Sequence, residues 1–277
     1  MTPPFTLAGK VALITGAGRG IGFAVAQKLA ACGASVMIND LDPVPLSQAH
    51  AVIAAEGGRV AQSSGDITAP DFPNQLVAQT LAELGGLDII VNNAGYTWDN
   101  VIQKTTDEQF QAMLDIHIVA PFRVLRAAAG HIRESAKREI AEGHRVVRKV
   151  VNITSISGTN GIAGQSGYAS GKSALIGFTR TLAKEWGRYN VTVNAVGFGL
   201  IDTRLTQALS PEAKIHVKGR EIAVGVPPAV RESLATSIPL GRAGSVDEAA
   251  GPVVFFCSPL SDYVTGEILI ASGGMHF

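Results

Sequence analysis

A tyrosine and a lysine four residues apart are the first side chains in this sequence whose types and spacing suit catalysis. Tyr168 and Lys172 enclose Ala-Ser-Gly, and residues at this spacing share one face of a helix, so both can point into one cleft. A neighbouring ammonium group favours phenolate over phenol and should lower the pKa of Tyr168 toward working pH, where the residue can act as a general acid or base. The same spacing also occurs between unrelated surface residues, so it needs support from other positions.

Ser155 gives this support. It follows a Val- and Ile-rich segment, residues 149–154, and stands thirteen residues before Tyr168. Ligands of doubly wound sheets bind at the carboxyl ends of the strands, where a serine hydroxyl can donate a hydrogen bond to a substrate carbonyl oxygen. Ser155, Tyr168 and Lys172 are therefore the candidate catalytic residues for proton transfer at the oxygen of a carbonyl/alcohol pair.

The second chemical motif is a glycine-rich turn, Thr-Gly-Ala-Gly-Arg-Gly-Ile-Gly, at residues 15–22. Glycines let the backbone approach a pyrophosphate closely, and the amides at the start of a helix stabilise its negative charge. The spacing is T-G-x-x-x-G-x-G and not G-x-G-x-x-G, and an isolated match would describe an ordinary strand-to-helix turn as often as a nucleotide site. The candidate ligands in this turn are Gly16, Arg19, Gly20, Ile21 and Gly22.

An acidic residue at the end of the second apolar segment favours the nucleotide interpretation. Asp40 follows the glycine turn at the distance from which a carboxylate can accept hydrogen bonds from an adenosine ribose. The same carboxylate would repel a ribose 2′-phosphate, whereas Arg19 in the turn would attract one. The sequence therefore predicts NAD(H) as the favoured cofactor and leaves NADP(H) possible.

Short apolar segments alternate with amphipathic segments of helical length along the chain. Apolar strands joined by helices imply a parallel sheet that is covered on both faces and wound with right-handed crossovers. We expect a single domain over residues 1–277, a Rossmann-type doubly wound sheet of about seven strands in three α/β/α layers. The expected strands are residues 11–15, 35–39, 60–63, 87–91, 149–154, 191–196 and 268–270, and the expected helices are residues 20–32, 46–56, 72–84, 107–135 and 168–186.

One segment does not follow this alternation. Residues 205–237 contain Gly219, Gly225, Pro227 and Pro228 and lie beyond the sixth expected strand. Long irregular connections often cover a binding site, so the segment is predicted to be a mobile loop or a lid over the substrate.

Composition argues against several other classes of protein. Lys and Arg number 23, as do Asp and Glu, so no global field favours nucleic acid, and the basic stretch 133–149 is interleaved with glutamates, which predicts a solvated helix face. No group of His, Cys, Asp and Glu has the spacing of metal ligands, and neither a signal peptide nor a membrane-spanning run is expected. Cys32 and Cys257 suit buried free thiols, and a cytoplasmic location is expected.

Taken in order, these motifs resemble those of the short-chain dehydrogenase/reductase family, from about Leu7 to the C-terminus. Further matching segments are Asn-Asn-Ala-Gly at residues 92–95 and Ile-Asp-Thr at residues 201–203. The resemblance implies an NAD(P)-dependent oxidoreductase. It assigns Asp66 and Ile67 to the adenine, Asn93, Ala94 and Gly95 to the nucleotide ribose, Ile201 and Thr203 to the nicotinamide carboxamide, and Lys172 with Tyr168 to the nicotinamide ribose.

Within the family, residues 93–100 and the Gly-Gly-Met ending at residues 273–275 resemble the 3-oxoacyl thioester reductases. His117 stands where those enzymes have the asparagine that positions a water in the proton relay, and it therefore joins the candidate catalytic residues. Phe198 replaces the proline of their Pro-Gly pair. Residues 132–148 and 214–228 are longer than in the ordinary reductases, which leaves the size and the carrier of the substrate open.

The expected activity is hydride transfer between NAD(H) and a 3-oxoacyl thioester, carried by acyl carrier protein or CoA, or its (3R)-3-hydroxyacyl counterpart. The alternatives are a dehydrogenase of a steroid, a sugar or another secondary alcohol and, in a different class, a dinucleotide-sensing protein without turnover. The expected partners are the small-molecule substrate and, where it carries the acyl chain, acyl carrier protein, with neither nucleic acid nor a membrane among them. The resemblance also implies a homotetramer.

Overall fold

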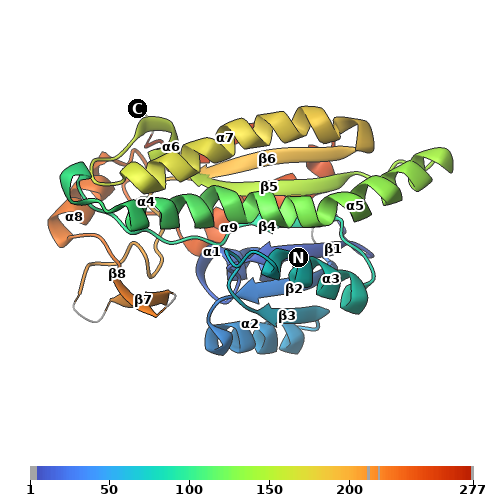
Figure 1. Cartoon of the computed structure of the whole chain (residues 1–277), viewed down its shortest axis with the longest axis horizontal. Coiled ribbons are helices and arrows are strands. Elements are labelled where there is room, and N and C mark those ends of the chain that lie inside the picture. Colours follow the sequence, from blue (N-terminus) through green and yellow to red (C-terminus); the bar gives the residue numbers. More distant parts are fainter. Residues whose placement is uncertain (1–4, 211–212, 218, 276–277) are drawn as a thin grey trace.

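The central sheet has the parallel, doubly wound form that the alternation predicts. The computed structural model describes residues 5–210, 213–217 and 219–275. The seven strands of the central sheet lie in the order β3-β2-β1-β4-β5-β6-β9, and each neighbouring pair is parallel (Figure 1). The order reverses between β1 and β4, at the type of switch point where such sheets bind ligands. The strands are β1 Val11–Thr15, β2 Ser35–Asp40, β3 Val60–Ser64, β4 Ile89–Asn92, β5 Arg148–Ser155, β6 Val191–Phe198 and β9 Ile268–Ala271.

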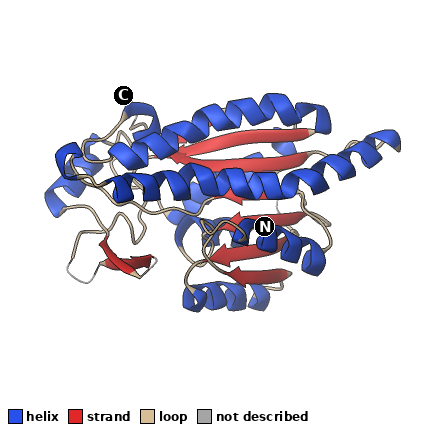
Figure 2. Ribbon diagram, viewed as in Figure 1, coloured by secondary structure: helices blue, strands red, loops and turns tan. Residues whose placement is uncertain are grey.

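Helices cover both faces of this sheet, because successive strand residues point to opposite sides (Figure 2). Ala12 and Ile14 of β1 share one apolar core with α1, α2 and α9, whereas Val11 and Leu13 share the other with α3, α4, α5 and α7. The three-layer arrangement is therefore confirmed. The helices are α1 Gly20–Ala31, α2 Pro43–Ala55, α3 Phe72–Leu84, α4 Asp107–Leu114, α5 Ala120–Ala141, α6 Ile156–Asn160, α7 Ser166–Trp186, α8 Pro228–Ser237 and α9 Val246–Cys257.

The long helix predicted over residues 107–135 is interrupted in the structure. Between α4 and α5 the chain forms a π-helical turn, Asp115–Val119, and α5 then continues to Ala141. Pro121 has no N–H to donate to the carbonyl of His117 four residues earlier, so the regular α-helical pattern cannot continue through this point. The prediction of one helix that ends near residue 135 was wrong both in its continuity and in its end.

The basic stretch at residues 133–149 is only partly a solvated helix face. Arg148 and Lys149 begin β5, where they are 5% and 4% exposed. The Arg148 guanidinium donates two hydrogen bonds of 2.7 Å to the Glu139 carboxylate, and Lys149 Nζ lies 2.7 Å from Asp262 Oδ1. These opposite charges offset the lost hydration, and the prediction of solvent exposure was wrong for both residues.

The segment at residues 205–237 contains regular structure that was not predicted. Strands β7 Lys214–Val217 and β8 Arg220–Ala223 pair as an antiparallel hairpin, and α8 follows them. Ile215 and Ile222 of this hairpin belong to a small apolar cluster that packs against Tyr96 and Trp98 after β4. Residues 211, 212 and 218 of the predicted lid lie outside the described residues.

Other predictions need smaller corrections. Helix α7 begins at Ser166, so Tyr168 lies in its first turn and not at its first residue. Cys32 is the C-cap residue after α1 and is partly exposed, so the prediction of a buried free thiol holds for Cys257 alone. Over the described ranges, no helix is long and apolar enough to cross a membrane, and no group of three or more His, Cys, Asp or Glu side chains is placed to hold a metal ion.

Candidate active site

Ser155, Tyr168 and Lys172 come together at the carboxyl end of the sheet. Ser155 is the last residue of β5 and also caps α6, because its Oγ accepts a hydrogen bond of 3.1 Å from the N–H of Ser157. Tyr168 and Lys172 lie on the first turns of α7, which packs against β5. A side-chain hydrogen bond joins Ser155 to Tyr168. The structure thus brings the three predicted residues to one place.

Lys172 is held between β5 and α7, where it is 5% exposed. Its Nζ donates a hydrogen bond of 2.7 Å to the carbonyl oxygen of Ile153 and lies 5.7 Å from the centroid of the Tyr168 ring. Loss of hydration disfavours the ammonium form and lowers the pKa of Lys172 to about 7. The side chain can therefore change its charge near neutral pH.

Loss of hydration has the opposite effect on the phenol of Tyr168, because it disfavours the phenolate. It raises the pKa of Tyr168 to about 12, a shift that the Ser155 hydrogen bond opposes and the Asp99 charge increases. The prediction that Lys172 brings this pKa toward neutrality was therefore wrong for this structure, in which desolvation outweighs the other effects. At neutral pH the Tyr168 hydroxyl keeps its proton and can donate it.

His117 packs beside Tyr168 from the π-helical turn. The two rings are nearly perpendicular, with centroids 4.9 Å apart, and His117 is 1% exposed. Its Nε2 lies 2.8 Å from the carbonyl oxygen of Tyr96, which can only accept, so Nε2 carries the proton. Within the described part of the chain, Nδ1 is a buried acceptor without a partner. Burial and the charge of Lys172 lower the pKa of His117 well below its usual value, so the imidazole is neutral.

The glycine turn forms an open cradle at the start of α1. Gly20 has a φ of +59° and leaves free space where a side chain would begin. Arg19 at the N-cap makes no side-chain capping bond in the described structure, so its side chain leaves the first amides of α1 available to a ligand. Gly22 serves packing instead, because a Cβ there would lie 2.3 Å from the carbonyl oxygen of Gly16. The turn therefore offers both the room and the donors that a pyrophosphate requires.

Asn93 and Ala94 hold this turn against β4. The Asn93 side-chain amide donates hydrogen bonds of 3.0 and 2.9 Å to the carbonyl oxygens of Thr15 and Gly16. The backbone N–H groups of Asn93 and Ala94 both donate to Thr15 Oγ1 at 3.1 Å. These two residues are thus part of the scaffold of the glycine turn, a use that sequence reasoning missed.

Asp40 lies at the end of β2, directly beside the glycine turn. Its Oδ2 accepts a hydrogen bond of 2.9 Å from the N–H of Gly18, and its Oδ1 accepts one of 3.1 Å from the N–H of Asp42. Arg19 forms an exposed ion pair of 2.6 Å with Asp42. The acid and the base that bear on the choice of cofactor therefore both adjoin this turn.

The remaining residues assigned to the cofactor lie after β3, β4 and β6. Asp66 Oδ1 accepts hydrogen bonds of 2.8 and 2.7 Å from the N–H and the hydroxyl of Thr68. Ile67 and Ile201 are buried, and Thr203 begins a turn in which its N–H donates to Thr206 Oγ1 at 3.0 Å. Gly95 makes room for the site, since a Cβ there would lie 2.6 Å from Cε1 of His117.

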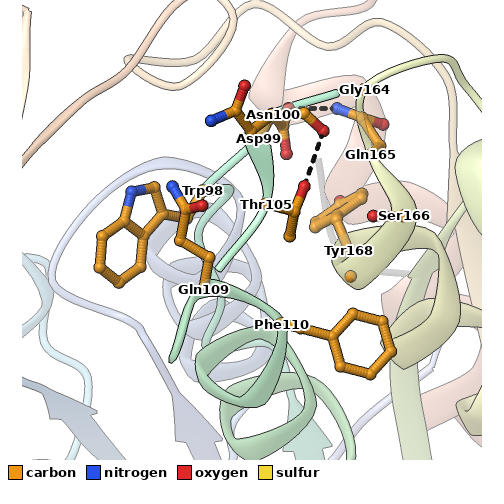
Figure 3. Close-up of a pocket in the computed structure, with 11 residues that line it drawn as sticks. Trp98, Asp99, Asn100, Thr105, Gln109, Phe110, Gly164, Gln165, Ser166 and Tyr168 are labelled. Atoms are coloured by element: carbon orange, nitrogen blue, oxygen red, sulfur yellow. Dashed lines mark hydrogen bonds between the residues drawn. The ribbon is translucent and has the colours of Figure 1, made fainter. Parts of the chain in front are cut away.

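A pocket beside Tyr168 contains side chains that sequence reasoning did not select. It is lined by residues 98–100 after β4, by residues 105, 109 and 110, and by residues 164–168 at the start of α7 (Figure 3). In it Gln165 Nε2 donates a hydrogen bond of 2.6 Å to Asp99 Oδ2, while Gln165 Oε1 accepts one of 2.8 Å from Ser157 Oγ. No motif or periodicity relates residue 99 to residue 165, because only the tertiary fold brings them together.

Known proteins resemble this chain over nearly its whole length. The model of the family described as Enoyl-(Acyl carrier protein) reductase matches residues 16–276. The 3-oxoacyl-[acyl-carrier-protein] reductase FabG of Chlamydia muridarum is 34% identical over 271 residues, which cover 97% of this chain and 98% of that protein.

Solved structures extend the likeness to three dimensions. A blue fluorescent protein from a metagenomic library, in complex with NADPH, has 30% identity and a TM-score of 0.81 over 98% of this chain and 99% of its own. A gluconate 5-dehydrogenase from Burkholderia cenocepacia J2315, in complex with NADP and tartrate, has 28% identity and a TM-score of 0.83 over 98% of this chain and 96% of its own. With this extent of likeness and the motifs in their family order, the chain belongs to the short-chain dehydrogenase/reductase family of nicotinamide-dependent oxidoreductases.

Proposed function

We propose that the chain transfers a hydride between NAD(H) and the keto group of a 3-oxoacyl thioester, or the hydroxyl group of its (3R)-3-hydroxyacyl counterpart. The observation that carries this proposal is the meeting of Ser155, Tyr168 and Lys172 at the sheet edge that also holds the glycine turn. A dinucleotide sensor without turnover would use the glycine turn but has no need of a buried lysine beside a proton-donating tyrosine.

The residues at this edge fit a dinucleotide. The open space at Gly20 and the first amides of α1 would receive the pyrophosphate, and Asp40 would receive the adenosine ribose. The bound nicotinamide would supply or accept the hydride. The adenine would lie by Asp66 and Ile67, the nucleotide ribose by residues 93–95, the carboxamide by Ile201 and Thr203, and the nicotinamide ribose by Tyr168 and Lys172.

In the direction of reduction, the substrate carbonyl oxygen would lie between the hydroxyls of Ser155 and Tyr168. Ser155 donates a hydrogen bond that stabilises the negative charge developing on this oxygen, and Tyr168 transfers its Oη proton to it. A pKa of about 12 keeps Tyr168 protonated and ready to donate. Lys172 in its charged form stabilises the phenolate that remains, and in the reverse reaction this phenolate removes the proton from the alcohol.

His117 is proposed to hold the water that returns a proton to Tyr168. Its Nε2 is occupied by the carbonyl oxygen of Tyr96, so Nδ1 is the atom that can accept a hydrogen bond from water. The contact between the rings of His117 and Tyr168 puts this acceptor in the neighbourhood of the proton donor. The neutral imidazole would thus take over the role of the asparagine found in the 3-oxoacyl reductases.

NAD(H) is the proposed preferred cofactor, with NADP(H) as the alternative. A 2′-phosphate would meet the carboxylate of Asp40, and Arg19, which would attract it, is already paired with Asp42. The alternative draws support from the related structures solved with NADPH and NADP. Steady-state kinetics should give a kcat/KM about tenfold higher with NADH, and an equal or higher value with NADPH would reverse the assignment.

The thioester substrate draws support from the FabG relatives, and acyl carrier protein and a homotetrameric assembly belong to the same proposal. The β7–β8 hairpin and α8 would then form the lid over the acyl chain. A second candidate substrate is a sugar acid. The polar side chains of Asp99, Asn100 and Gln165 in the pocket beside Tyr168 favour it, as does the likeness to a gluconate 5-dehydrogenase.

A substrate panel separates these candidates. Acetoacetyl-CoA, an acetoacetyl thioester of acyl carrier protein, a keto sugar acid and a steroid ketone would each be assayed through the absorbance of reduced nicotinamide. The highest kcat/KM for a thioester supports the first proposal, and the highest for the keto sugar acid supports the second. Intact cofactor binding without turnover of any ketone or of the corresponding alcohols would contradict both and favour the sensor.

A further inference from the structure

We propose that Asp99, Gln165 and Ser157 form a positioning chain that fixes the direction in which the Ser155 hydroxyl donates its hydrogen bond. The three residues act through Ser155 and do not touch the reacting atoms. The proposal rests on the role given to Ser155 under the proposed function, but it does not depend on which carbonyl compound is the substrate.

The first support is the pairing of two loops that are distant in sequence. The N–H of Asn100 donates a hydrogen bond of 2.9 Å to the carbonyl oxygen of Gly164, and Asn100 and Gln165 form a parallel bridge. This backbone pairing sets the carboxylate of Asp99 opposite the side-chain amide of Gln165 (Figure 3). The contact between the two side chains is therefore imposed by the fold.

The second support is the order of hydrogen-bond donors and acceptors along the positioning chain. An ionised carboxylate only accepts, so Gln165 turns Nε2 toward Asp99 Oδ2, 2.6 Å away. Oε1 at the other end of the amide only accepts, and it takes the hydroxyl proton of Ser157 over 2.8 Å. Because the single hydroxyl proton of Ser157 is donated to Gln165, the Ser157 oxygen can only accept a hydrogen bond from Ser155. Asp99 thus decides, through two bonds, what Ser157 offers to Ser155.

The consequence lies at the Ser155 hydroxyl. Its oxygen accepts from the N–H of Ser157 at 3.1 Å, and its hydroxyl is also hydrogen-bonded to Tyr168. The other described partners of its proton, Ser157 Oγ at 3.3 Å and the carbonyl oxygen of Phe198 at 3.4 Å, act as acceptors. Hydrogen bonds between oxygens at these separations are long and weak. A substrate carbonyl oxygen at ordinary distance would take this proton at little cost. If the Gln165 amide were reversed, Nε2 would face Ser157 in place of Oε1. The Ser157 hydroxyl would then be free to donate its proton to the Ser155 oxygen.

The positioning chain can be tested with single and double variants of the whole enzyme. Their kcat would be measured with the ketone of the panel that the wild type reduces best. Ser157→Ala and Gln165→Met should each lower kcat about threefold to tenfold, because each removes one hydrogen bond that orients Ser155. The double variant should lose no more than either single one, since both break the same chain. Asp99→Asn should keep more activity than Asp99→Ala, because its amide oxygen can still accept from Gln165.

A matched control is available on α6, outside the pocket. The Thr159 hydroxyl donates a hydrogen bond of 3.0 Å to the carbonyl oxygen of Ile156 and has no part in the positioning chain, so Thr159→Ala should keep the kcat of the wild type. Cofactor affinity and the midpoint of thermal unfolding should stay unchanged in Ser157→Ala and Gln165→Met. A loss of kcat at constant cofactor affinity and constant unfolding midpoint is the signature of positioning, which a purely structural defect would not produce.

Ser155→Ala, measured in parallel, separates failure of this proposal from failure of the proposed function. Wild-type turnover in Ser155→Ala would show that the site itself is wrongly assigned and would remove the basis of the chain. An inactive Ser155→Ala together with wild-type kcat in Ser157→Ala and Gln165→Met would leave the site intact and overturn the positioning chain. Additive losses in the double variant, with a lowered unfolding midpoint, would also overturn it.

Discussion

The glycine turn and the segment at residues 205–237 are both expected to face the ligands, yet they are held in different ways. The glycine turn is fixed by four partly buried hydrogen bonds from Asn93 and Ala94, at the centre of the main sheet. The later segment has its own small apolar cluster, and Arg231 of α8 reaches back to Asp202 through a partly exposed ion pair of 2.6 Å. Contacts of the first kind create a preformed site, whereas the second kind allow a segment to open separately from the core. We therefore expect the cofactor to bind at a rigid region and the substrate to be enclosed by an adaptable one.

The largest effect is expected from Tyr168 in the first turn of α7. Tyr168→Phe keeps the ring and removes only the transferable proton, so kcat should fall about 100-fold to 10,000-fold. Cofactor affinity, measured by fluorescence titration, should change little. Turnover near that of the wild type would mean that another group donates the proton.

Lys172→Met should make stability depend less on pH. The pKa of Lys172 is about 7 in the folded protein and 10.5 when unperturbed, so between these values the unfolded chain binds a proton that the folded one has released. This group therefore makes the unfolding free energy of the wild type rise with pH, by about 1.4 kcal/mol per pH unit within that window. Tyr168, whose pKa is raised to about 12, has its opposite effect only above pH 10.

Urea unfolding of both proteins between about pH 7 and pH 10 measures this difference. The wild type should gain stability relative to Lys172→Met as the pH rises, and the variant should have lost its turnover. Parallel pH profiles for the two proteins would show that Lys172 keeps its ordinary pKa in the folded state.

Gly22→Ala tests the rigidity of the glycine turn. The new Cβ would lie 2.3 Å from the Gly16 carbonyl oxygen and 2.4 Å from Asn93 Nδ2, so the turn must shift. The expected loss is about 1–3 kcal/mol of unfolding free energy, together with weaker cofactor binding. Gly251→Ala is the matched control, because its Cβ would point into open space on α9. Equal stability of the two variants would show that the turn is more adaptable than its hydrogen bonds indicate.

Substitution of His117 should lower kcat less than substitution of Tyr168. His117→Asn keeps a side chain that can accept from a water and should retain most of the turnover, whereas His117→Ala should lose about tenfold in kcat because it removes one hydrogen-bonded water contact. Because burial and Lys172 lower the pKa of His117 well below its usual value, its titration should be missing from the pH profile of the wild type. A kcat in His117→Ala equal to that of the wild type at every pH would reduce His117 to a packing residue.

The smallest effect on stability is expected in the hairpin. Ile222→Ala removes a buried side chain from the satellite cluster, but the hairpin can open without unfolding the main sheet, so the unfolding midpoint should change by about 2 °C or less. The KM for the substrate should rise while the affinity for the cofactor stays constant. A loss of stability as large as that of Ile14→Ala in β1 would show that both regions unfold as one unit.

The same contrast explains how much the sequence could predict. The glycine turn, the strands of the main sheet and the Tyr168–Lys172 pair are encoded by local spacing, so their existence and place in the fold were predicted from the sequence alone. The break at Pro121 could also have been predicted, because proline and the carbonyl four residues earlier that it leaves without a donor are both read from the sequence. Arg148 and Lys149 were misplaced because their partners, Glu139 and Asp262, are identified only by the fold.

The hairpin and the Asp99–Gln165 contact could not have been predicted in the same way. The strands of the hairpin are four residues long and carry charged side chains, so their alternation is too short to distinguish from a loop. Asp99 meets Gln165 through a backbone pairing between two loops, and pairings of this kind leave no periodic pattern. The pKa of Tyr168 was misjudged for a related reason, since burial depends on every element packed around the residue.

Transfer of the hydride can be followed directly with an isotope. Purified protein would be mixed with acetoacetyl-CoA and reduced cofactor that carries deuterium at both hydrogen positions of C4 of the nicotinamide, and the product would be analysed by mass spectrometry. We expect deuterium on the new carbinol carbon with the wild type and almost none with Tyr168→Phe. Cofactor binding by the wild type with no deuterium in the product, from this ketone or from any other of the panel, would contradict the proposed hydride transfer.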